Sequence, residues 1–184
     1  MIANSLADKL DAAKVLSMDS YYRDLTTVDS EELEHWNFDH PSALDYNLLR
    51  EHISELSAGR SVIKPIYRYP SHTRGSAGVK FVPGVYIILD GLFALYWEDV
   101  LEYCQLKVFV ATSDAVCLRR RLQRDPTERG FTSDYIMMQY HETVRPMYKK
   151  FVHNTRKRAD IIVNGEDKCE KSVEEIFNMA SKVE

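Results

Sequence analysis

Apolar residues along this chain recur in patterns that alternate between helices and short buried strands. Ile2, Leu6 and Leu10 share one helical face, which predicts a helix over residues 2–11. Continuous apolar runs predict buried strands at 14–17, 85–89, 106–110 and 160–163. Further helices are expected after Asp45 and over 114–124, 133–151 and 173–182. Strands alternating with helices indicate an α/β fold with a largely parallel sheet.

The ends of several elements carry their own signals. Asp45 is a suitable cap for the helix that Gly59 would stop. Ser172 with Glu175 matches a capping box and predicts the start of the last helix. Residues 61–69 alternate weakly and indicate a strand, which Pro65 favours placing at an edge, with 79–82 as its hairpin partner. Residues 20–44 show little periodicity, and a loop of that length is often functional.

Composition excludes several classes of protein. A length of 184 residues fits one domain over 1–184, and a net charge of −4 gives no field that would recruit nucleic acid. No apolar run approaches the ~18 residues of a membrane span, and the N-terminus does not match a signal peptide. Three widely spaced cysteines predict neither a disulfide framework nor a zinc site. We therefore expect a cytoplasmic protein with reduced thiols.

Two carboxylates are expected where ligands bind in open α/β sheets, beyond the carboxyl ends of the strands. Asp19 follows the strand at 14–17, and Asp90 closes the strand at 85–89. A pair of acids at neighbouring strand ends suits a catalytic base and a partner for Mg²⁺, which prefers a few carboxylates completed by water and phosphate oxygens. The alternative is that each acid only caps a turn.

Four segments together resemble the uridine kinases (uridine–cytidine kinases) of the phosphoribulokinase/uridine kinase group of P-loop proteins. They read VLSMDSYYR at 15–23, NFDHPSALD at 37–45, PIYRYPSHTR at 65–74 and RDPTERG at 124–130. Each is weak alone, but four in the right order at compatible spacings are specific. The resemblance covers residues 2 to about 165. It implies a P-loop NTPase-like three-layer sandwich with a mostly parallel sheet, an acceptor hairpin at about 61–83 and a helical lid at about 119–133.

The resemblance also implies roles for individual residues. Asp19 would take the proton from the nucleoside 5′-hydroxyl, and Asp39 would accept hydrogen bonds from the ribose hydroxyls, although an Asx turn also explains Asp39. Arg124 and Arg129 would close over the phosphates of ATP (or GTP), and Asp19 with Asp90 would hold Mg²⁺. The remaining substrate-binding residues implied by the resemblance are Tyr22, Tyr67, Tyr69, His72, Arg121 and Gln139. The alternative for Tyr69 is packing in the core. The alternative for Arg121, Arg124 and Arg129 is a solvated helix face.

The sequence departs from the family at three places. The strand and the glycine-rich loop G-x-x-x-x-G-K-[ST] have no counterpart, so this exact chain is expected to lack useful kinase activity. Without that strand, the strands at 14–17 and 85–89 would lose a hydrogen-bonding neighbour, and we expect the functional protein to have roughly 15–20 more N-terminal residues. Asp90 stands where the family usually has Glu, and Phe131 where it typically has Arg.

The leading functional hypothesis is ATP-dependent phosphorylation of the 5′-hydroxyl of uridine or cytidine, as in pyrimidine salvage. A second is a non-catalytic relative that binds nucleosides or a partner subunit. A third is a kinase of the same group with another small acceptor, such as a sugar phosphate or pantothenate. The expected partner is a small nucleoside, not nucleic acid or a membrane, and a homo-oligomer is compatible with the sequence.

Overall fold

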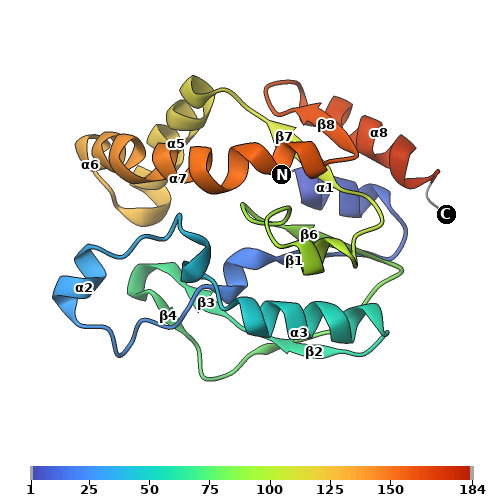
Figure 1. Cartoon of the computed structure of the whole chain (residues 1–184), viewed down its shortest axis with the longest axis horizontal. Helices are drawn as coiled ribbons and strands as arrows, with labels where there is room; N and C mark the ends of the chain where they lie inside the picture. The colour runs from blue at the N-terminus through green and yellow to red at the C-terminus, as the bar shows by residue number, and fades with distance from the viewer. Residues whose placement is uncertain (1, 183–184) are drawn as a thin grey trace.

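The computed structural model describes residues 2–182, in which helices alternate with short strands (Figure 1). The helices are α1 (Ile2–Lys9), α2 (Ser30–Glu34), α3 (Tyr46–Ser57), α4 (Glu98–Leu101), α5 (Asp114–Arg129), α6 (Ser133–Gln139), α7 (Arg145–Met147) and α8 (Cys169–Ala180). The strands are β1 (Ala13–Ser17), β2 (Val62–Lys64), β3 (Tyr67–Arg68), β4 (Thr73–Arg74), β5 (Val79–Phe81), β6 (Tyr86–Asp90), β7 (Val108–Ala111) and β8 (Ile161–Asn164).

The longer strands pair in parallel, as the apolar runs predict. β1 pairs with β6 from Ala13 opposite Tyr86 to Ser17 opposite Asp90, and β7 pairs with β8. The predicted pairing of the 61–69 region with 79–82 is confirmed by the antiparallel pair of β2 with β5, and a second antiparallel pair, β3 with β4, lies between them in the chain. The strand expected over 61–69 is therefore interrupted around Pro65, which cannot donate a ladder hydrogen bond.

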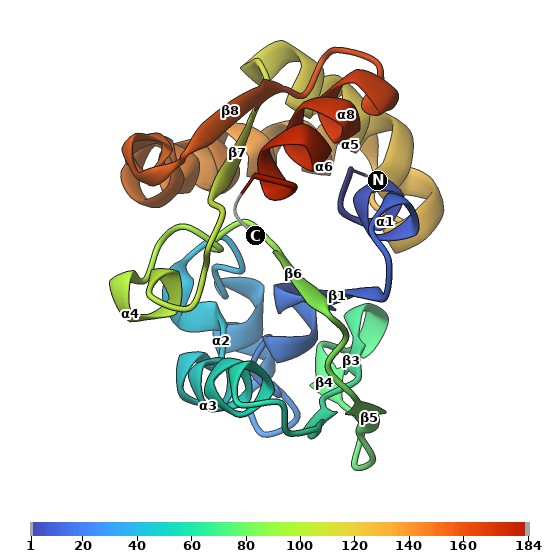
Figure 2. The same cartoon turned by 90° about the vertical axis from the view of Figure 1, so that its right-hand side faces the viewer.

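Apolar side chains form two cores on opposite faces of the parallel strands. One core joins α1 and α8 to the strands through Leu6, Val163 and Ile176, and Figure 2 shows these two helices next to each other. The other joins α3 and the 93–101 region to the opposite face through residues that include Leu16 and Leu49. The expected three layers, helix on strand on helix, follow from this two-sided burial.

A cavity of about 1100 Å³ separates the two parallel pairs. Residues 83–92, which include all of β6, line one side of it, and residues 103–110, which include most of β7, line the other. Apolar side chains along both borders stay exposed, such as Val85 at 77% and Val110 at 43%. β1 pairs directly with β6, so no strand lies between these two, and the cavity separates β6 from β7.

Several element boundaries also differ from the predictions. The capping box is wrong, because α8 begins at Cys169 and the buried Ser172 lies inside it, donating its hydroxyl to the carbonyl of Asn164. Helix α5 continues past 124 to Arg129, with Pro126 in its last turns. The helix predicted over 133–151 is a run that contains π-helical turns at Tyr140–Val144 and Tyr148–Val152.

The predicted start of α3 is confirmed at the atomic level. Asp45 caps α3, its carboxylate accepting a hydrogen bond from the amide of Leu48 at 3.3 Å. Helix α1 ends at Lys9, close to the predicted end. Within residues 2–182, we find no helix that combines the length and the apolar character needed to cross a membrane.

Candidate functional site

The two predicted strand-end acids lie side by side. Asp90 is the last residue of β6 and pairs in register with Ser17 at the end of β1, and Asp19 follows two residues later in a 3₁₀ turn. Burial, together with the negative charge of Asp19, raises the pKa of Asp90. A like charge favours the neutral form of Asp90, and a cation bound beside the two acids would relieve this repulsion.

The donor set at this place fits magnesium better than zinc or calcium. The residues described by the structure contain no group of three or more His, Cys, Asp or Glu arranged to hold a metal ion. Mg²⁺ commonly takes only one or two carboxylates and completes its coordination with water and phosphate oxygens. Asp19 and Asp90 supply that number of carboxylates, so the residues present fit this ion.

Tyr69 contacts the predicted base directly. Its hydroxyl donates a hydrogen bond to Oδ2 of Asp19 at 2.9 Å, and the guanidinium of Arg129 lies over its ring at 5.5 Å. Burial and the charge of Asp19 raise the pKa of Tyr69, so the hydroxyl keeps its proton at neutral pH and stays a donor. The alternative that Tyr69 only packs in the core is wrong, because 39% of the residue is exposed.

Four rings form an aromatic cluster beside these acids. The Tyr22 ring lies 5.3 Å from that of Tyr67 and 5.9 Å from that of Phe38, and Phe38 stacks on His72 at 4.6 Å between centroids. The residues come from the turn after β1, the loop before α3 and the β3–β4 hairpin. Sequence reasoning did not assign a role to Phe38, although its place beside Asp39 in the NFDHP segment was a usable signal.

Two polar atoms in this cluster are buried without a partner among the described residues. They are the hydroxyl of Tyr67 and Nδ1 of His72. Burial raises the pKa of Tyr67 to about 12, and burial together with Arg129 lowers the pKa of His72, so both groups are neutral near pH 7. Buried polar groups are normally hydrogen-bonded, so this donor and this acceptor are available for partners from outside the described residues.

Asp39 connects this cluster to the predicted lid. Its side chain is 12% exposed, and Oδ1 lies 3.6 Å from Nη2 of Arg121 on α5. Burial raises the pKa of Asp39, while Arg121 and Arg129 act in the opposite direction. Arg121 also reaches Asp125, with 4.0 Å between Nη1 and Oδ2. Both Asp39 and Arg121 line the cavity between β6 and β7, so the cavity reaches this ion pair.

Asp125 is a second residue whose role sequence reasoning missed. Its carboxylate is fully buried, and Arg124 approaches Oδ1 through Nε and Nη2, both at 2.7 Å. Nε of Arg129 lies 3.9 Å from the same oxygen. The usable signal was an acid in the predicted helical lid with arginines one turn away on either side, at i−4 and i+4, and a third directly before it. Asp125 thus holds together the arginines of the predicted lid.

The structure gathers most, but not all, of the predicted site residues. Linked by contacts in one region are Asp19, Tyr22, Asp39, Tyr67, Tyr69, His72, Arg121 and Arg129. Arg124 joins them only through Asp125, and 44% of its side chain is exposed. Gln139, at the end of α6, makes no hydrogen bond with this group among the described residues.

Comparisons with known proteins show the family and the fold. The model of the phosphoribulokinase / uridine kinase family matches residues 2–170. Uridine kinases of Yersinia enterocolitica and Cronobacter sakazakii are each 42% identical over 149 residues, covering 81% of this chain and 70% of theirs. The solved phosphoribulokinase from Rhodobacter spheroides superposes with a TM-score of 0.69 at 13% identity, covering 89% of this chain and 64% of that one, which is a likeness of fold.

Proposed function

Because this chain belongs to the phosphoribulokinase/uridine kinase family, we propose that it binds uridine or cytidine and presents the 5′-hydroxyl for phosphoryl transfer from ATP. The observation that carries this proposal is the pair of buried, unpartnered atoms in the aromatic cluster, Tyr67 Oη and His72 Nδ1. A pyrimidine base offers a flat face for stacking and an edge with donors and acceptors that would satisfy both atoms.

The acids beside the cluster suit the rest of a nucleoside. Asp39 would accept hydrogen bonds from the two ribose hydroxyls, because an ionised carboxylate has two acceptor oxygens. Arg121 at 3.6 Å favours the ionised form of Asp39 and so supports this role. Asp19 would take the proton of the 5′-hydroxyl, and the hydrogen bond from Tyr69 fixes the orientation of its carboxylate.

The donor side of the reaction requires groups around the phosphates. Asp19 and Asp90 would hold Mg²⁺, which supplies neutralisation of the phosphate charge when bound. Arg124 and Arg129 would contact the phosphates, and both are partly exposed at the end of α5, as such a role needs. The Asp125 carboxylate would hold these arginines in place before the phosphates arrive.

The glycine-rich loop that would cradle those phosphates is not in this sequence. We propose that a β-strand leading into such a loop fills the cavity between β6 and β7, because both strands border it and their apolar residues are exposed there. The 184-residue chain alone would then bind nucleoside but not transfer phosphate. Phosphorylation of uridine by this chain without any added segment would contradict this part of the proposal.

Isothermal titration of the 184-residue chain with uridine tests nucleoside binding. We expect saturable binding, and Tyr67→Phe should raise the Kd about three- to tenfold, because it removes one hydrogen bond and leaves the ring. Tyr135→Phe is the matched control, since Tyr135 lies on α6 with 41% of the residue exposed. No uridine binding, or equal effects of the two substitutions, would count against the proposal.

The same titration, carried out with ATP, distinguishes a kinase from a non-catalytic relative that only binds nucleosides. The absence of the glycine-rich loop from this sequence favours the non-catalytic alternative. We expect the chain to bind ATP only when a strand and a G-x-x-x-x-G-K-[ST] loop are fused ahead of Ile2. In that fusion, Asp19→Asn should lower kcat far more than it changes uridine affinity. A fusion that folds and binds uridine but neither binds nor uses ATP would support the non-catalytic reading.

A further inference from the structure

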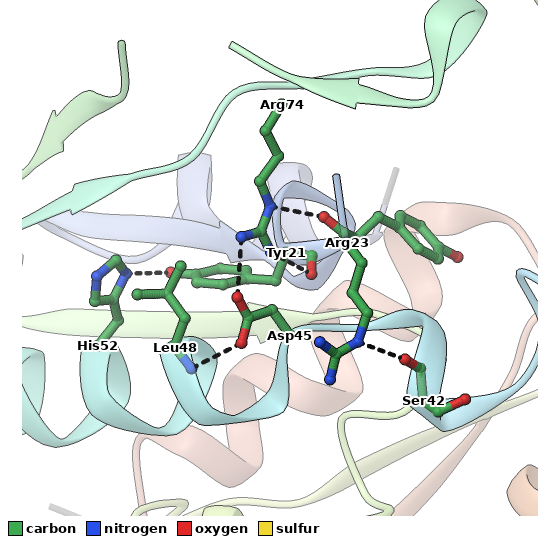
Figure 3. Close-up of polar contacts among 8 residues, drawn as sticks. Tyr21, Arg23, Ser42, Asp45, Leu48, His52 and Arg74 are labelled. Atoms are coloured by element: carbon green, nitrogen blue, oxygen red, sulfur yellow. Dashed lines mark hydrogen bonds and ion pairs between the residues drawn. The ribbon is translucent and has the colours of Figure 1, made fainter. Parts of the chain in front are cut away.

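The guanidinium of Arg74 joins the β3–β4 hairpin to two other segments of the chain (Figure 3). Its Nε donates to the carbonyl of Tyr22 at 2.7 Å, and Nη2 donates to the carbonyl of Tyr21 at 2.8 Å. Nη1 forms an ion pair with Oδ2 of Asp45 at 3.0 Å. The Arg74 side chain is only 17% exposed, so these bonds lie largely away from water.

The hairpin that Arg74 anchors carries one wall of the aromatic cluster. Arg74 stands directly opposite Tyr67 in the β3–β4 ladder, so the positions of the two residues are coupled. The carbonyl held by Nε belongs to Tyr22, whose ring forms the facing wall 5.3 Å from that of Tyr67. A backbone bond from the amide of Leu25 to the carbonyl of His72 joins the same two segments at 3.0 Å.

The partners of Arg74 are themselves fixed to helix α3. The amide of Asp45 donates to the carbonyl of Tyr21 at 2.7 Å, and the carboxylate of Asp45 caps the helix. The buried ring of Tyr21 reaches α3 through a 3.0 Å hydrogen bond between its hydroxyl and Nδ1 of His52. The anchor for Arg74 is therefore part of the core, while the hairpin reaches that core through few bonds.

We propose that Arg74 is a positioning residue that sets the distance between the Tyr22 wall and the Tyr67–His72 wall, and thereby restricts the pocket to a single-ring base. This inference rests on the proposed function for the identity of the ligand. A planar guanidinium can satisfy a carboxylate and two carbonyls at once, whereas the compact ammonium of lysine cannot span all three. Replacing arginine by lysine should therefore loosen the hairpin without removing its charge.

The test compares Arg74→Lys with the matched control Arg23→Lys. Arg23 is also drawn in Figure 3, but its Nε bonds only the carbonyl of Ser42, at 2.8 Å, and lies outside the hairpin. We expect Arg74→Lys to raise the Kd for uridine about tenfold or more and to reduce the preference for uridine over adenosine. A residue with only a general stabilising role would leave that preference unchanged.

A second measurement needs no ligand. Hydrogen exchange of the backbone amides at 67–69 and 71–75 should become at least about tenfold faster in Arg74→Lys and stay unchanged in Arg23→Lys. Asp45→Asn, which removes the charged acceptor, should shift both readouts in the same direction by less. If the wild-type chain binds no uridine, the proposed function fails. Hydrogen exchange still tests whether Arg74 holds the hairpin in place. Unchanged exchange at 67–69 and 71–75, or an unchanged uridine preference, would overturn the inference.

Discussion

The buried carboxylate of Asp125 gives the sharpest prediction for stability. Asp125→Asn keeps the shape of the side chain but removes the charge that three arginines face. Arg124 alone contributes two contacts of 2.7 Å to Oδ1, while Arg121 and Arg129 lie 4.0 and 3.9 Å from the carboxylate. Loss of the charge weakens these bonds and leaves the guanidinium groups repelling one another.

The size of the effect follows from the burial of the partners. Hydrogen bonds to charged groups contribute about 1.5–3 kcal/mol, and the lower half of that range applies to Arg124 because 44% of its side chain is exposed. Adding the repulsion among the released arginines, we expect Asp125→Asn to lower the free energy of unfolding by about 2–3 kcal/mol. For a chain of this length that corresponds to a fall in Tm of about 4–12 °C.

Glu128→Gln is the matched control for this experiment. Glu128 faces the same Arg124 Nε at 4.0 Å, but its side chain is 66% exposed, so its loss should cost under about 1 kcal/mol. Urea denaturation followed by circular dichroism measures both variants, and a double-mutant cycle with Arg124→Gln isolates the coupling, expected at about 1–2 kcal/mol for Asp125. Equal small losses for the two acids, or no coupling, would refute the reasoning.

Two further predictions concern the fold. Burial lowers the pKa of His52 below its usual 6.5, so as the pH falls through 6.5 the unfolded chain takes up a proton that the folded ring refuses, and stability should decline. His52→Gln should reduce the difference in urea midpoint between pH 7.5 and 5.5, and an unchanged difference would contradict this account. Gly84→Ala would place a Cβ atom 1.9 Å from the carbonyl oxygen of Ala12 and should cost about 1–3 kcal/mol, measured by the same denaturation. Gly75→Ala, whose Cβ meets only an ordinary 3.5 Å contact, should cost clearly less, and equal losses would disprove the steric argument.

The strand and helix pattern was predictable because burial on both faces leaves a direct trace in the sequence. The apolar run at 85–89 predicted β6, and Asp45 correctly predicted the start of α3. The capping box at Ser172 failed because its hydroxyl bonds the carbonyl of Asn164, a contact outside the helix that no local pattern reveals. Pro65 favoured an edge position but could not indicate that the hairpin region divides into two separate ladders.

The site was predictable in its members but not in its connections. The motif segments identified Asp19, Asp39 and His72 as candidate site residues, and the structure places all three in one region. The hydrogen bond from Tyr69 to Asp19 joins residues 50 positions apart, and sequence reasoning left Tyr69 between pocket and core. Asp125 escaped notice because an acid among arginines on a helix is most often a solvated charge pair.

The sequence by itself determined the alternation of elements, the family resemblance and the absence of a glycine-rich loop, because these depend on residue identity and local spacing. Tertiary structure alone decided where the sheet is interrupted, between β6 and β7, since strand order depends on which edges meet in space. It likewise decided that Arg74 spans three acceptors and that Asp125 is buried. Hydrogen bonds and burial of charge depend on distances between segments remote in sequence, which local patterns do not encode.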